Sequence, residues 1–232
     1  MKTNLLLKTV FCFMMLVLVT SCASHKYYTS SYFDQKTANH RIIAILPAEM
    51  IFTGVQPKNI SPEDITKMEE VESRSFQVSL ANGILRYANT KNYYTSVGVQ
   101  DVSTTQKLLE ENHISVRGSW TEDDRKLAKL LGVDAVVRMR IQKKRYMSDL
   151  ASMGVGMGRE VLEQIGTVAR FPVPYVSNRT NDIYASCNIV CDNQTLWNDH
   201  YQRGADYNNP SEEVIDEITN NFGRHFPYRK RR

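Results

Sequence analysis

A strand buried on both faces is the clearest structural signal in this chain of 232 residues. Residues 41–47 read Arg-Ile-Ile-Ala-Ile-Leu-Pro, so a continuous apolar run lies between a charged residue and a proline. A sheet with one face in water alternates polar and apolar side chains, whereas a strand covered by helices on both sides does not need to. The run therefore favours an α/β fold with a central sheet between helices.

Start signals for helices follow at several points. Ser61 precedes a proline and two acidic residues, and this pattern predicts an amphipathic helix over Pro62–Asn89. The same kind of reasoning predicts helices over Thr104–Asn112, over residues 121–132 and over residues 210–222. Segments with strand patterns lie between most of these helices.

Strands are predicted near Tyr94–Val99 and over Val133–Ile141. Alternating apolar residues over Ile183–Cys191 predict a half-buried strand, Asp192–Thr195 predicts a turn, and Leu196–Trp197 begins the return strand. Strand and helix thus alternate until the chain ends in a β-hairpin and a C-terminal helix. We predict an α/β fold in which helices flank a mixed sheet in a three-layer-like arrangement.

The first 21 residues have the pattern of a secretory signal peptide. Lys2 and Lys8 precede an apolar run over residues 10–19, which is too short to span a bilayer. The run ends in Val-Thr-Ser-Cys22, which resembles the bacterial lipobox, in which the cysteine is acylated and the chain is cut in front of it. The alternative is an ordinary signal peptide with a chance cysteine. We predict lipidation at Cys22, because acyl chains anchor a protein durably without a spanning helix.

The remaining residues suffice for one sizeable domain. We divide them into a lipidated, structureless tether over residues 22–39, a single periplasmic α/β domain over 40–228, and a basic tail over 229–232. No aspartate follows Cys22, and no acidic cluster of the kind that resembles a surface-export signal is present. We therefore expect the periplasmic face of the outer membrane, with surface exposure as the alternative.

Charge argues against nucleic acid as a partner. The formal net charge is +4, and the signal peptide carries two of the lysines, which leaves about +2 for the mature chain. The one local excess is Arg229–Arg232. It could contact phosphates of anionic lipid or lipopolysaccharide, but we interpret it as a solvated tail.

The mature chain keeps two thiols, at Cys187 and Cys191, in an oxidising compartment where pairs often bridge. Four residues of strand separate their Cα atoms by roughly 13 Å, beyond the reach of a disulfide. We expect two small core side chains rather than a disulfide or a metal site.

The chain offers no catalytic, metal or cofactor motif that we could assign. Gly154, Gly156 and Gly158 invite a dinucleotide interpretation, but Arg159 stands where the third glycine of that fingerprint belongs. The preferred interpretation is a flexible or closely packed connection, and contact with a neighbouring subunit is one form that it could take. The five histidines are scattered, which favours surface or loop positions.

Three segments suggest a family, namely residues 43–47, 124–137 and 192–197. Their order and pattern resemble the envelope lipoprotein superfamily that includes CsgG, LpoB and the N-terminal domain of TolB. The middle segment, with Leu-Leu-Gly-Val-Asp-Ala at residues 130–135, is the most specific. The resemblance implies a sheet flanked by helices and a role through protein contacts.

Our leading hypothesis is a non-enzymatic outer-membrane lipoprotein that acts as an adaptor or assembly factor for envelope proteins. The first alternative is a subunit of a CsgG-like secretion ring, and hence a homo-oligomer. That role requires membrane-crossing hairpins, whereas residues 147–180 contain glycines, a helix-like stretch and prolines. The second alternative is a peptidoglycan-binding or synthase-regulating lipoprotein in which Trp197, Tyr201 and Tyr207 stack on sugars, although such aromatics more often pack within a hairpin.

Overall fold

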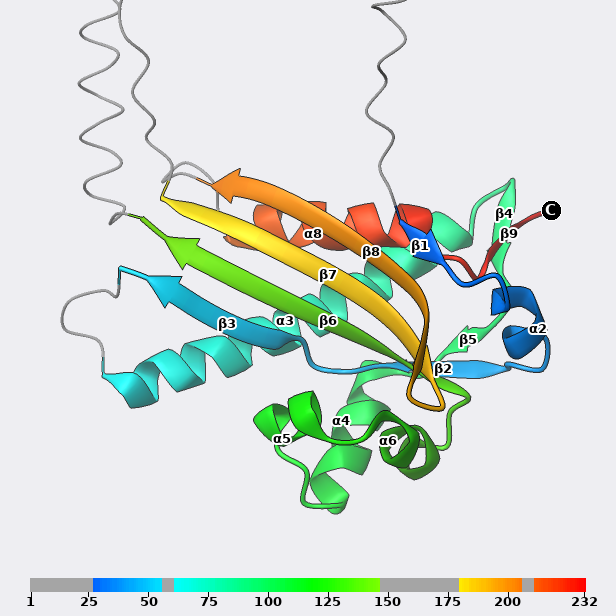
Figure 1. Cartoon of the computed structure of the whole chain (residues 1–232), viewed down its shortest axis with the longest axis horizontal. Coiled ribbons are helices and arrows are strands. Elements are labelled where there is room, and N and C mark those ends of the chain that lie inside the picture. Colours follow the sequence, from blue (N-terminus) through cyan, green and yellow to red (C-terminus); the bar gives the residue numbers. More distant parts are fainter. Residues whose placement is uncertain (1–26, 56–60, 147–179, 206–210) are drawn as a thin grey trace, which may run out of the picture.

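The computed structural model describes residues 27–55, 61–146, 180–205 and 211–232, and a mixed sheet organises them (Figure 1). Its strands lie in the order β1-β8-β7-β6-β2-β5. The strand β2 pairs with the first part of β6, and β3 pairs with the later part of β6. The strands of this sheet are β1 (Tyr28–Thr29), β2 (Ile42–Ile45), β3 (Glu49–Gly54), β5 (Gly98–Val99), β6 (Ala135–Arg145), β7 (Asn181–Cys191) and β8 (Gln194–Ala205). A second sheet joins β4 (Tyr93–Thr95) to β9 (Arg229–Arg231).

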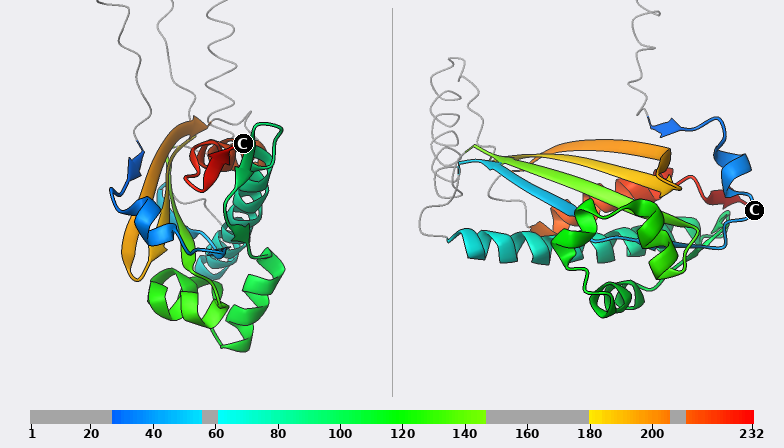
Figure 2. Two further views of the ribbon diagram at one scale, coloured as in Figure 1. Left: turned by 90° about the vertical axis from the view of Figure 1, so that its right-hand side faces the viewer. Right: turned by 60° about the horizontal axis from the view of Figure 1, so that its bottom comes forward.

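The helices form two groups. The long α3 (Pro62–Ala88) and α8 (Ser211–His225) lie on one side of the sheet, as Figure 2 shows. The short helices α4 (Val102–Glu111), α5 (Val116–Thr121) and α6 (Asp124–Leu131) gather at the end of the sheet near β2, and α2 (Phe33–Thr37) precedes β2. Within the described ranges, no helix combines the length and the apolar character needed to span a bilayer. The predicted α/β class, with a mixed sheet flanked by helices, is confirmed.

The strand β2 shows why the sheet needs helices on both faces. It pairs in parallel with β5 on one edge and β6 on the other. Ile43 and Ile45 belong to the large core beneath α3 and α8, whereas Ala44 and Leu46 belong to a smaller core with α4 and α6. The apolar run was therefore interpreted correctly, because alternate residues enter two different cores.

The helices α3 and α8 pack closely against each other. Ser61 caps α3, since its hydroxyl accepts a hydrogen bond from the amide of Asp64. Farther along, Gly83 of α3 meets Gly223 of α8, and a Cβ at Gly223 would lie 2.8 Å from the backbone of Gly83. The absence of side chains at this crossing lets the two backbones approach.

One arginine holds the short helices to the sheet. The guanidinium of Arg138 on β6 pairs with Asp124 and donates to the carbonyl oxygens of Ser119 at 2.8 Å, Trp120 at 3.1 Å and Glu122 at 2.6 Å. These groups lie at the end of α5 and the start of α6. A single half-buried side chain therefore satisfies the backbone between the two helices.

The hairpin of β7 and β8 matches its prediction. Asp192 and Asn193 have φ angles of +49° and +61°, and Cys191 pairs with Gln194 around them. Two consecutive residues with positive φ form the kind of tight turn that suits the twist of paired strands, and asparagine and aspartate tolerate it. Asn193 also accepts a hydrogen bond from the amide of Arg125 at 3.0 Å, which ties the turn to α6.

The predicted tether and tail are partly wrong. Tyr28 and Thr29 pair with Asn198 and Trp197 as strand β1, and Phe33 is buried in the main core. From residue 28 on, the expected structureless tether is therefore part of the folded body. The basic residues 229–231 are not a free tail either, because they form β9 against β4, although Arg231 is exposed.

Smaller differences concern elements that the sequence analysis did not assign or did not separate. The strand β3 and the helices α2 and α5 were not predicted. The strand predicted near Tyr94–Val99 is two strands in different sheets, β4 and β5. Residues 1–21, Cys22 and the segment 147–179 lie outside the described residues.

Candidate functional site

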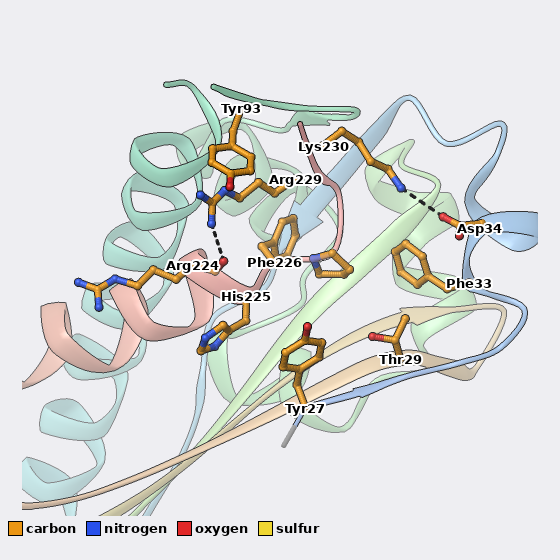
Figure 3. A pocket seen from close by; sticks show the side chains of 11 residues that line it. Tyr27, Thr29, Phe33, Asp34, Tyr93, Arg224, His225, Phe226, Arg229 and Lys230 are labelled. Atoms are coloured by element: carbon orange, nitrogen blue, oxygen red, sulfur yellow. Dashed lines mark hydrogen bonds and ion pairs between the residues drawn. The ribbon is translucent and has the colours of Figure 1, made fainter. Parts of the chain in front are cut away.

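A pocket lies where the two ends of the described chain meet (Figure 3). Its volume is about 390 Å³. The residues that line it come from the N-terminal β1 and α2, from β4, and from the C-terminal end of α8 and β9; they are Tyr27, Thr29, Phe33, Asp34, Tyr93, Arg224, His225, Phe226, Pro227, Arg229 and Lys230. The pocket thus depends on β1 and β9, the two segments that were expected to be unstructured.

Aromatic rings form one part of this pocket. The Phe33 ring lies 5.3 Å from that of Tyr228, which is 5.7 Å from that of Phe226. At the other side, the rings of Tyr27 and His225 stack at 5.6 Å. Rings packed in this way are rigid, because each side chain has few rotatable bonds. The pocket wall is therefore preformed.

Cations surround the aromatic wall. Lys230 pairs with Asp34 at 3.2 Å, and Figure 3 shows this contact across the pocket. The guanidinium of Arg229 stacks 3.8 Å from the centre of the Tyr93 ring and donates to the carbonyl of Arg224 at 2.8 Å. Asp34 is the one carboxylate among the lining residues of the described chain. The pocket rim therefore carries a net positive charge.

His225 has a buried carboxylate as its partner. Its Nδ1 lies 3.1 Å from Asp199, whose side chain is 0% exposed and also accepts a hydrogen bond from the amide of His200 at 2.8 Å. The pair joins the end of α8 to β8. A carboxylate held in this way orients the imidazole, and the stacked Tyr27 ring covers it.

A second titratable cluster involves His40, Cys191 and Tyr228. The Tyr228 hydroxyl lies 2.6 Å from Nδ1 of His40, and Nε2 of His40 lies 3.7 Å from the Cys191 sulfur. Burial lowers the pKa of His40 and raises the pKa of both Cys191 and Tyr228. All three shifts favour neutral groups, whereas a nucleophilic cysteine needs a lowered pKa. The cluster therefore serves packing better than covalent chemistry.

The outer face of the sheet, opposite α3 and α8, carries polar side chains. Two rows of paired residues cross β6, β7 and β8 here, namely Arg140, Ser186 and His200, and Gln142, Tyr184 and Gln202. Tyr184 is 40% exposed, and Ser186 is the only half-buried member of the two rows. In Figure 1 these strands lie in front of α3 and α8. We call this surface the outer sheet face.

The residues singled out in the sequence are not brought together. Trp197 is 0% exposed and packs edge-on against Phe226 at 5.9 Å, so it offers no platform to a ligand. The hydroxyl of Tyr201 donates a hydrogen bond to the Glu217 carboxylate at 2.5 Å. Tyr207, Gly154, Gly156, Gly158 and Cys22 lie outside the described residues.

The two thiols are core side chains, as expected. Cys187 is fully buried, and Cys191 is partly buried against the same core. In the described ranges, no group of three or more histidine, cysteine or acidic side chains is placed to hold a metal ion.

The sequence contained a partial signal for the pocket. Phe226 and Tyr228 come directly before the basic run that starts at Arg229, so aromatic and basic residues adjoin in the sequence at the C-terminal end. Read as a strand, this pattern places aromatic and basic side chains side by side. The partner segments at residues 27–34 and 93–95 could not be identified from spacing.

No family model matches the sequence, and no curated protein matches it either. The structure is similar to lipoprotein GNA1162 from Neisseria meningitidis, with 10% identity, a TM-score of 0.38, and coverage of 79% of this chain and 94% of that one. It is also similar to the PelC dodecamer from Paraburkholderia phytofirmans, with 5% identity, a TM-score of 0.40, and coverage of 87% and 94%. The LpoB C-terminal domain from Salmonella enterica is 8% identical, with a TM-score of 0.35 and coverage of 72% of this chain and 83% of that one. At these identities and TM-scores the likeness assigns neither a superfamily nor a function, and the resemblance to envelope lipoproteins stays a prediction from the sequence.

Proposed function

We propose that the chain is a lipoprotein acylated at Cys22, held at the periplasmic face of the outer membrane, and that it acts as a non-enzymatic adaptor for other envelope proteins. The observation that carries the adaptor role is the outer sheet face. It presents side chains from three adjacent strands on a rigid support, and no helix of the described chain lies over its two rows of polar residues.

The chemistry of this face suits a protein partner. Arg140 and His200 offer donors, Gln142 and Gln202 offer amides that both donate and accept, and Tyr184 adds an exposed ring. Interfaces between proteins are enriched in tyrosine and arginine, with polar groups at the rim. We therefore expect the partner to present carboxylates and amide groups to this surface.

Photo-crosslinking in the native envelope tests the proposal. A photoreactive residue at position 184 or 200 should yield a discrete adduct with another protein, identified by mass spectrometry. The matched control is position 67 on α3, where Lys67 is also exposed but lies away from the outer sheet face. Adducts from position 67 alone, or adducts of the same kind from all three positions, would contradict the assignment.

A subunit of a CsgG-like secretion ring is the second candidate, and one observation favours it. The strand β3 pairs with β6 from Glu49 opposite Arg140 to Gly54 opposite Arg145, and no strand within the described residues pairs with its other edge. An open strand edge can pair with the edge of another copy. Particle mass in detergent and electron microscopy decide between the candidates, because a ring of many copies would replace the adaptor proposal.

A further inference from the structure

We propose that the basic end of the domain lies against the membrane and binds the phosphate groups of its anionic lipid headgroups. The basic end consists of Lys91, Arg224, Arg229, Lys230, Arg231 and Arg232. This inference rests on the proposed acylation of Cys22, and it adds a second, charge-based contact to the lipid anchor.

The cations of the basic end are fixed to the body of the protein. Strand β9 pairs with β4, with Arg231 opposite Tyr93, and the amide of Arg232 donates to the carbonyl of Asn92 at 3.0 Å. Because Asn92 directly follows Lys91, this hydrogen bond brings Arg232 close to Lys91 in the chain. A free basic tail would lose conformational entropy on binding, whereas this one is already ordered.

The same end is tied to the anchor. Residues 23–26 are all that separate Cys22 from Tyr27, and a fully extended chain covers at most about 18 Å over those five steps. Tyr28 and Thr29 are paired with β8, so the tether cannot lengthen by releasing residues without breaking β1. Tyr27 lines the same pocket as Arg229 and Lys230. The pocket therefore lies within one short tether of the lipid surface.

Charge complementarity identifies the occupant of this surface. Lys91, Arg231 and Arg232 are exposed, and the Lys230 side chain is 43% exposed although it pairs with Asp34. A lysine or arginine near an anionic membrane surface contributes roughly a fivefold gain in binding. Arginine and lysine bind phosphate oxygens through charge-assisted hydrogen bonds. Headgroup phosphates are the anions that the anchor brings within reach.

The test uses the full mature protein, with acylation first verified by intact mass. The protein is placed in nanodiscs of phosphatidylcholine alone or with phosphatidylglycerol added. Hydrogen–deuterium exchange is then followed in residues 27–34 and 224–232, with residues 183–190 of β7 as an internal reference. We expect roughly fivefold or greater slowing of exchange at both ends, and only in the phosphatidylglycerol discs.

Charge-reversal variants distinguish binding by the basic end from the attraction of the protein's overall charge to an anionic membrane. The combination Lys91→Glu, Arg231→Glu and Arg232→Glu changes exposed side chains and should abolish the slowing. The control combination Lys67→Glu, Lys107→Glu and Lys129→Glu changes the net charge equally on α3, α4 and α6 and should retain it. Exchange of β7 in phosphatidylcholine discs shows that each variant is folded.

Three outcomes would overturn the proposal: equal exchange in the two kinds of disc, equal loss in both sets of variants, or the same slowing in phosphatidylcholine discs when inorganic phosphate is added. The last outcome would identify free phosphate as the ligand. A chain without acyl mass would instead contradict the proposed anchor, so the two failures are distinguishable.

Discussion

Gly223 faces Gly83 where α8 crosses α3, and a Cβ on Gly223 would lie 2.8 Å from both the carbonyl carbon and the carbonyl oxygen of Gly83. The reverse change is less crowded, because a Cβ on Gly83 would lie 3.1 Å from the carbonyl oxygen of Thr219. The two glycines thus set how closely the helices approach on the core side of the sheet. Phe76 of α3 and Phe222 of α8 are both buried in the main core.

The first prediction concerns this crossing. Gly223→Ala should lower the free energy of unfolding by about 2 kcal/mol, because overpacking outweighs the better helix propensity of alanine. Gly83→Ala should cost less, since its nearest contact is longer. Denaturant unfolding measures both, and Asn82→Ala at an exposed position of α3 is the control. Equal stability of Gly223→Ala and wild type would contradict the tight crossing.

Elements with a local pattern could be predicted from the sequence. The apolar run before Pro47 and the alternation over Ile183–Cys191 each encode their burial in neighbouring residues, and both strands are present. Strand β3 has no such code, because it forms by pairing with β6, about 90 residues away in the chain. Strand β9 is an extreme case, since three consecutive basic residues are strand only because β4 lies beside them.

The pocket could not be predicted for the same physical reason. Its contact between Asp34 and Lys230 joins residues 196 positions apart. Composition suggested a solvated basic tail, and nothing in the spacing indicated that β1 would bring Tyr27 to the same place. Trp197 shows the opposite error, because the sequence offered it as a possible ligand platform and the structure buries it. A tryptophan in a hairpin can face a ligand or the core, and here it faces the core, where it packs against Phe226.

The second prediction concerns Arg138. Arg138→Met should lower the free energy of unfolding by about 3 kcal/mol, because it leaves Asp124 and the three carbonyls of Ser119, Trp120 and Glu122 without their donor. Arg138→Lys should recover only part of this, since lysine cannot reproduce the planar fork. Arg140→Met is the control, as its pair with Glu49 is 3.6 Å long and 61% exposed on the arginine side. A loss of similar size in Arg140→Met would contradict the clamp.

The third prediction is a pH dependence at Asp134, whose carboxylate accepts from the amides of Arg41 at 2.6 Å and Ile42 at 2.9 Å. Burial raises the pKa of Asp134, but the two amides, together with the charges of His40 and Arg41, outweigh burial and lower this pKa below its ordinary value of 3.8. A lowered pKa in the folded state means that the stabilisation is present above pH 3.8 and disappears as the pH falls through the folded value.

Asp134→Asn should therefore flatten the decline of stability below about pH 4 that denaturant melts show for the wild type. Glu63→Gln in the exposed first turn of α3 controls for the removal of one carboxylate. An unchanged acid slope in Asp134→Asn would show that the link between β2 and the start of β6 does not depend on this charge.

The fourth prediction separates the two thiols of the described residues, Cys187 and Cys191. Burial and the nearby Asp199 raise the pKa of Cys187, and burial followed by Asp192 raises that of Cys191. At pH 8 both should thus carry less thiolate than an unfolded cysteine, with Cys187 inaccessible until the chain unfolds and Cys191 reacting slowly. Alkylation followed by mass spectrometry resolves the two sites, and the chain in guanidinium chloride is the reference in which both react. Rapid labelling of Cys187 in the folded protein would contradict its place in the core. A third labelled thiol, at Cys22, would count against acylation.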